Sequence, residues 1–131
     1  MAEEMPLDPG RKIIDSHLHL WEIFPAPGTM VQPQRFFVPE AAEMIAASGH
    51  NVTYTVFLEC GAMYRADGPE ELRCLGETEF VRGQAAMSGS GRYGPAKIAH
   101  RIVGTANLLL GDKVRPVLEA HHQVSRPGES H

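Results

Sequence analysis

The sequence contains few of the residues that mark specialised classes of small protein. Two cysteines, Cys60 and Cys74, occur among 131 residues, without a CxxC pair or a cysteine–histidine cluster. This pattern excludes a disulfide scaffold and a cysteine-rich zinc module. Both cysteines are therefore expected to be free thiols in a reducing cytoplasm.

An excess of basic charge and long apolar runs are also lacking. The chain has 12 basic and 16 acidic residues, a formal net charge of -4, which favours neither nucleic acid nor acidic lipid as a partner. No apolar run approaches the roughly 20 residues of a membrane-spanning helix. Residues 1–4, MAEE, lack the positive start of a signal peptide. We expect a cytoplasmic protein with no nucleic-acid or membrane partner.

The sequence does contain alternating signals for strands and helices. Pro39 suits a first helical turn and Gly49 a helix end, and the segment 51–59 is apolar on both faces, as in a covered parallel strand. This order predicts an α/β fold with a parallel sheet. The expected strands are 13–21, 51–59 and 102–110, and the expected helices are 39–48, 69–87 and 111–122, with a helical turn at 95–100.

Between the first strand and the first helix lies a long segment, residues 22–38, with three prolines and a glycine. A structureless loop of this length inside a domain is uncommon unless it is functional or disordered. We expect it to be mobile and to lie over the C-terminal ends of the strands, where it would shape a pocket. The alternative is a flexible surface excursion.

His17 and His19 form the most informative pair. Residues two apart in a strand point to the same face, with Cα atoms about 6.6 Å apart, so both imidazoles can reach one ion at Zn–N distances of about 2.0–2.1 Å. A His-x-His pair also arises by chance. Its position at the C-terminal end of the first strand, where barrel enzymes place catalytic residues, favours the metal interpretation.

The segment around this pair, IIDSHLHLW at residues 13–21, resembles the first-strand motif of the amidohydrolase superfamily, in particular the amidohydrolase-2 group of TIM-barrel hydrolases. The segments TVFLEC at 55–60, AMYR at 62–65 and GD at 111–112 followed by PVLEAH at 116–121 are similar to that group as well. The resemblance extends to about His121, although only the histidine pair is diagnostic of function.

The resemblance implies that His17 and His19 bind a divalent metal, usually zinc. The ion would activate a water that attacks the carbonyl of a small-molecule ester, lactone or amide. Other members of the family catalyse decarboxylation or hydration. The family's further histidine and aspartate on later strands have no counterpart here.

A complete (β/α)₈ barrel needs about 200–250 residues, so we expect the N-terminal part of a TIM barrel, about three β/α units. Residues 1–131 would then form an incomplete barrel domain with a disordered tail at 123–131. Truncation, a frameshift and a split gene remain open explanations. An unpaired strand edge would favour self-association, and such a fragment should be weakly active or inactive alone.

Three further residues are candidates near the metal. Asp15 shares the parity of the histidines and could orient one of them, or be a polar group satisfied within the barrel. Glu59 could contact metal or substrate, although a solvated acid at a strand end is favoured. Arg65 could hold a substrate carboxylate, with a surface arginine slightly preferred.

Two alternatives to a hydrolase remain. The chain could be a non-catalytic domain that keeps the metal pair for binding. It could also be a small α/β binding domain in which the histidines are incidental.

Overall fold

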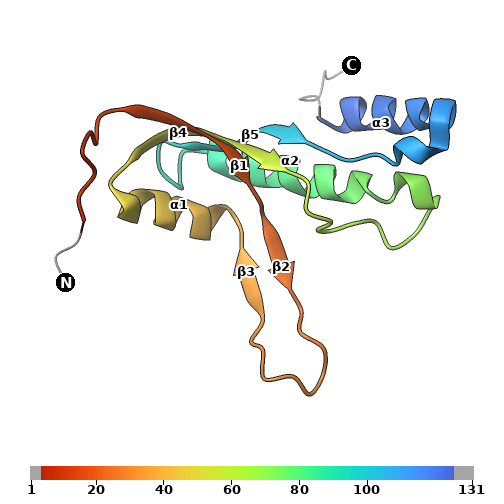
Figure 1. Cartoon of the computed structure of the whole chain (residues 1–131), viewed down its shortest axis with the longest axis horizontal. Helices are drawn as coiled ribbons and strands as arrows, with labels where there is room; N and C mark the ends of the chain where they lie inside the picture. The colour runs from red at the N-terminus through yellow and green to blue at the C-terminus, as the bar shows by residue number, and fades with distance from the viewer. Residues whose placement is uncertain (1–3, 126–131) are drawn as a thin grey trace.

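A computed structural model describes residues 4–125 of the chain (Figure 1). Three parallel strands, β1 (Lys12–Leu18), β4 (Asn51–Leu58) and β5 (Lys97–Val103), form one sheet in the order β1-β4-β5. The helices α1 (Val38–Ser48) and α2 (Leu75–Gly89) connect successive strands, and α3 (Arg115–Ser125) follows β5. The α/β prediction is confirmed at this level. Residues 4–125 form an open sheet, and no barrel is closed among them.

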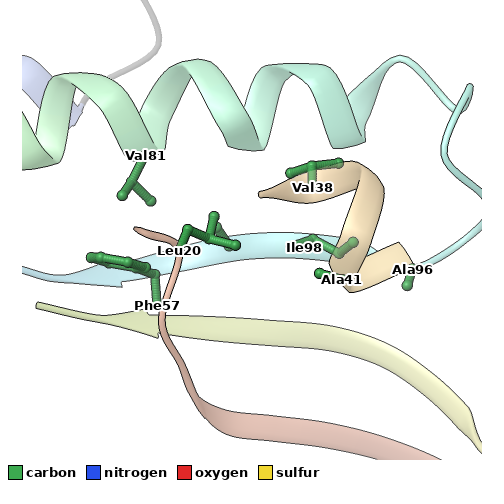
Figure 2. Close-up of a cluster of buried hydrophobic side chains, with 8 residues drawn as sticks. Leu20, Val38, Ala41, Phe57, Val81, Ala96 and Ile98 are labelled. Carbon is green, nitrogen blue, oxygen red and sulfur yellow. The ribbon is translucent and has the colours of Figure 1, made fainter. Parts of the chain in front are cut away.

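The core lies between the sheet and the helices α1 and α2 (Figure 2). Phe57 of β4 and Leu20 are fully buried, and Val81 of α2 points toward them. Val38 and Ile98 continue this layer toward α1. Buried apolar side chains of this kind supply the main driving force for folding, so one face of the sheet is covered by helices.

Local signals explain where α1 begins and ends. Pro39 occupies the first turn, where its missing N–H costs no hydrogen bond. The carboxylate of Glu40 accepts a bond from the Phe37 N–H at 2.9 Å, and the side-chain oxygen of Gln84 accepts one from the Val38 N–H at 3.0 Å. Gly49 ends the helix with a left-handed φ of 70°. The predicted bounds of this helix are confirmed.

The segment expected as a structureless loop contains an antiparallel hairpin. β2 (Trp21–Ile23) pairs with β3 (Gln34–Phe36). The first strand accordingly ends at Leu18 and not at residue 21. The hairpin begins where β1 ends, as expected, but it projects away from the three-stranded sheet (Figure 1). The expectation of a loop lying over the strand ends was therefore wrong.

A third parallel strand is present, as predicted, but only Ile102 and Val103 of the expected strand 102–110 belong to it. The third parallel strand is β5 at Lys97–Val103, where a helical turn had been expected. The Ser88 hydroxyl accepts a bond from the Ile98 N–H at 2.9 Å and donates one to the Ala96 carbonyl at 3.0 Å. These contacts from α2 hold the strand start in an extended form. The fold of this segment is thus decided by a helix several residues earlier in the chain.

The apolar run that had suggested the third strand forms a short 3-10 helix instead, η2 (Leu108–Val114). The Asn107 side chain starts it by accepting a bond from the Leu109 N–H at 3.0 Å. Leu109 is therefore left 96% exposed. α3 begins at Arg115, with Pro116 in its first turn, and continues to Ser125.

The expected disordered tail at 123–131 needs a correction, because residues 123–125 belong to α3. Residues 126–131 lie outside the described part of the chain. No helix within residues 4–125 is long and apolar enough to cross a membrane.

The face of the sheet opposite the core carries exposed side chains. Ile14, Tyr54 and Val103 are 64%, 41% and 50% exposed, and the ring of Tyr54 packs on that of His100 with 4.7 Å between the centroids. Both α1 and α2 lie on the other side of the strands (Figure 1). We call this surface the open face. Parallel sheets are usually covered on both faces, so the open face is an unusual feature.

Candidate metal centre

The two histidines of the first-strand motif lie together, as the sequence predicted. The Nε2 atoms of His17 and His19 are 3.1 Å apart, and the ring planes are nearly perpendicular, at 87°. Two ligands of a tetrahedral zinc ion with bonds of about 2.0–2.1 Å would be roughly 3.3 Å apart. The two nitrogens are therefore already at nearly the separation that one shared ion requires.

A contact from the neighbouring strand fixes the orientation of His19. Its Nδ1 atom lies 2.8 Å from the carbonyl oxygen of Leu58, the last residue of β4. A carbonyl only accepts hydrogen bonds, so Nδ1 carries the proton and the lone pair of Nε2 faces the Nε2 atom of His17. Metal-binding histidines are typically held this way by a backbone carbonyl on the second ring nitrogen. His19 thus has the tautomer and the support of a metal ligand.

The first strand contains an irregularity that decides where His17 points. Asp15 pairs with Thr55 and Leu18 pairs with Phe57, so three steps along β1 match two along β4. One extra residue on one strand is a β-bulge, which re-aims side chains. Leu18 packs with the core beside buried Phe57, and His17, its neighbour, is exposed. The bulge therefore places His17 on the open face of the sheet.

The same bulge corrects the prediction for Asp15. In a regular strand Asp15 and His17 would share a face, but here Asp15 lines a groove between β1 and α1 together with Thr55 and Ala41. Its carboxylate oxygen Oδ1 accepts a hydrogen bond from the backbone N–H of His17 at 3.1 Å. Asp15 therefore supports the bulge through the main chain, and it does not orient an imidazole.

Glu59 and Arg65 stand apart from the histidine pair. Glu59 is exposed, and its backbone N–H donates to the carbonyl of Val103 at 2.9 Å, which continues the ladder between β4 and β5. Arg65 forms a salt bridge with Glu79 on the surface of α2. This pairing occupies the guanidinium that had been a candidate for binding a substrate carboxylate.

The donor set of the site consists of two imidazoles. No group of three or more His, Cys, Asp or Glu side chains within residues 4–125 is arranged to hold a metal ion. Zinc sites usually have three or four protein ligands. The pair fits a divalent metal in its spacing, its tautomer and its chemistry, and it supplies only part of a coordination shell.

Sequence reasoning missed the residue that organises the loop after β4. Glu77 in the first turn of α2 is 2% exposed, and its Oε2 atom accepts bonds from the N–H groups of Cys60 at 3.1 Å and Ala62 at 2.6 Å. The Cys60 thiol lies 3.6 Å from the same oxygen. Burial and then the nearby Glu77 carboxylate raise the pKa of the Cys60 thiol to about 11. No signal in the sequence pointed to this role, because the helix was expected to begin at residue 69, which places Glu77 in its interior.

A second cluster joins α2 and α3 around His121. The Nδ1 atom lies 2.9 Å from the Thr78 hydroxyl, and Nε2 lies 2.8 Å from the Thr105 carbonyl and 3.4 Å from the Cys74 sulfur. Because the carbonyl requires a proton on Nε2, this nitrogen has no lone pair with which to deprotonate Cys74. Burial also raises the pKa of the Cys74 thiol above its usual value, which disfavours the thiolate. The contacts of this cluster therefore hold α3 against α2.

A large hollow is separate from the histidines. It has a volume of about 580 Å³ and lies between the loops that follow β4 and β5, where Tyr64, Arg73, Cys74 and Asn107 line it. His17 and His19 are not among its lining residues. The histidine pair therefore lies outside this hollow.

These features define an α/β chain with a two-histidine centre at the C-terminal end of its first strand. No protein-family model matches the sequence, and neither a curated protein nor a solved structure matches it. The geometry of the chain itself therefore carries the functional argument.

Proposed function

We propose that this chain binds a divalent transition metal through His17 and His19, and that the pair is the first-strand half of an amidohydrolase-type hydrolytic site. The observation that carries the metal-binding proposal is the geometry of the pair. The two Nε2 atoms are 3.1 Å apart, and the Leu58 carbonyl holds His19 so that its Nε2 lone pair points toward His17. Zinc is the metal that imidazole ligands and the resemblance favour.

In such a site the bound ion lowers the pKa of a water and polarises the substrate carbonyl. The residues of this chain contribute binding and orientation. His17 and His19 hold the ion, and the Leu58 carbonyl fixes the His19 ring. The Asp15 bond to the His17 backbone holds the bulge that aims the other imidazole. The hydrolytic step rests on the sequence resemblance and remains a proposal, with esters, lactones or amides of small molecules as substrates.

Metal binding is tested by equilibrium dialysis against Zn²⁺. The wild-type chain should take up zinc, whereas the double variant His17→Ala, His19→Ala should lose most of that uptake. His122→Ala is the matched control, because His122 is an exposed histidine on α3. Equal uptake by all three proteins would refute the assignment and support the alternative of an α/β binding domain with incidental histidines.

The hydrolytic half is tested separately, with activated esters and lactones and with zinc-loaded protein. We expect little turnover from this chain, because two imidazoles without the further ligands or a general base leave a metal-bound water poorly fixed. A rate well above that of free zinc, lost in His17→Ala, would overturn this expectation. Zinc uptake without turnover, even when a longer form of the protein supplies further ligands, would favour the non-catalytic metal-binding alternative.

A further inference from the structure

The metal pair and the open face of the sheet occur at the same place. His17 is exposed on that face and belongs to β1, an edge strand that pairs only with β4 in the sheet. Ile14, one residue before Asp15 on the same strand, pairs with Tyr54 and is 64% exposed. An incomplete ligand set and an uncovered apolar surface are therefore side by side.

We infer that two copies of this chain share one divalent metal ion, which is bound by His17 and His19 of both copies, and that the open faces pack against each other around it. This inference rests on the metal-binding half of the proposed function. It goes beyond it by naming the partner that completes the ligand set.

The number of ligands supports a second copy. One chain offers two imidazoles, and no third or fourth histidine, cysteine or acid within residues 4–125 is placed beside them. Zinc in a closed site is four-coordinate and tetrahedral. Two identical chains supply four imidazoles, and a twofold-symmetric pair that shares one ion must place that ion on the symmetry axis. The stoichiometry of a tetrahedral site is thus met with no other ligand.

The surface supports the same partner. Ile14, Tyr54 and Val103 expose apolar area on the open face, and a parallel sheet normally buries both faces. A twofold pairing would cover this face, which also carries His100 and Arg101, with an identical face. Four protein ligands would also leave no position for a water, which agrees with the low turnover expected of the chain alone.

The experiment measures mass and metal content together. Analytical ultracentrifugation of the full chain should give mainly monomer, near 14.4 kDa, in the presence of a chelator. It should give twice that mass with Zn²⁺, at one ion per two chains. Excess chelator should restore the monomer. Co²⁺ in place of Zn²⁺ should show the intense visible absorption of a tetrahedral site.

Two pairs of variants separate the ligands from the surface. His17→Ala should abolish the zinc-dependent doubling of mass, whereas His122→Ala should leave it unchanged. Ile14→Asp should weaken the zinc-dependent dimer at least tenfold, because it places a charge on the open face. Leu118→Asp is the control, because Leu118 is 50% exposed on α3, which packs against α2 and away from β1.

The outcomes distinguish this inference from the proposed function. One zinc per chain with the mass of a monomer would overturn the shared site and leave metal binding intact. No zinc uptake would overturn both. A zinc-dependent dimer that forms equally well with Ile14→Asp would overturn the packing of the open faces, since the chains would then meet elsewhere.

Discussion

Replacement of Glu77 should destabilise the protein more than any surface acid on the same helix. Its carboxylate accepts two backbone hydrogen bonds in a buried setting, from Cys60 and Ala62. Hydrogen bonds to a charged group contribute about 1.5–3 kcal/mol each. Glu77→Ala should therefore lower the free energy of unfolding by about 3–6 kcal/mol, a large share of the roughly 5–15 kcal/mol of a typical domain.

Glu77→Gln separates the charge from the acceptor. An amide oxygen can still accept both bonds, but neutral hydrogen bonds contribute only about 0.5–1.5 kcal/mol each. The loss should then be about 2–3 kcal/mol, the difference between charged and neutral bonds summed over two. This variant keeps the test informative if Glu77→Ala fails to fold.

Urea unfolding followed by far-UV circular dichroism gives both values, and Glu79→Gln is the matched control. Glu79 lies two residues further along α2, about half exposed in a surface pair with Arg65, and such pairs contribute about 0–1 kcal/mol. An unfolding midpoint of Glu77→Ala equal to that of Glu79→Gln would refute the idea that Glu77 anchors the loop.

Three further predictions concern the Cys60 thiol and the pairing of β4 with β5. In a Cys74→Ala background, alkylation of Cys60 should be slow at pH 8 and faster toward pH 11, because the pKa of its thiol is raised to about 11 and only the thiolate reacts. Glu77→Gln should speed the reaction at pH 8, and an unchanged rate would contradict the contribution of the Glu77 carboxylate to this pKa. The same raised pKa makes stability depend on pH: the contribution of Cys60 should be complete below pH 9 and lost as the pH rises toward about 11, because in that window the thiol ionises in the unfolded chain and not in the folded one. A urea midpoint that stays constant from pH 8 to 11 in the Cys74→Ala background would exclude this pH dependence. Thr55→Val should lower the free energy of unfolding by about 1–3 kcal/mol, because it removes the acceptor of the buried Ala99 N–H at 2.8 Å. Thr53→Val, at a half-buried site on the same strand, should lower it by less. An equal loss for the two variants in urea unfolding would refute the argument.

The parts of the fold that could be predicted from the sequence are those fixed by local signals. Pro39 and Gly49 mark the ends of α1, and the apolar run of β4 indicates a covered strand, so both were predicted within a residue or so. The start of β5 could not be predicted in this way. Ala99 has a φ of 54° there, and its N–H bonds to Thr55, which is 44 residues earlier in the chain. Such a conformation depends on contacts that no short window of sequence contains.

In the candidate site, too, local features could be predicted and features that depend on distant residues could not. The proximity of His17 and His19 was predicted from their spacing, although β1 ends at Leu18 and His19 follows it. The bond from His19 to Leu58 joins residues 39 positions apart, and the bulge depends on how β1 pairs with β4. The error over Asp15 came from that bulge, because a parity argument assumes a regular strand.

The edge position of β1 has a consequence for when the centre exists. No residue of β1 is buried, whereas β4 and β5 each contain buried residues. An edge strand with so little buried area is expected to fray before the rest of the sheet opens. The amide protons of β1 should therefore exchange with solvent faster than those of β4, and His17 should leave its place during each opening. A bound ion would hold the end of β1 in place, so added zinc should slow amide hydrogen exchange in β1 selectively.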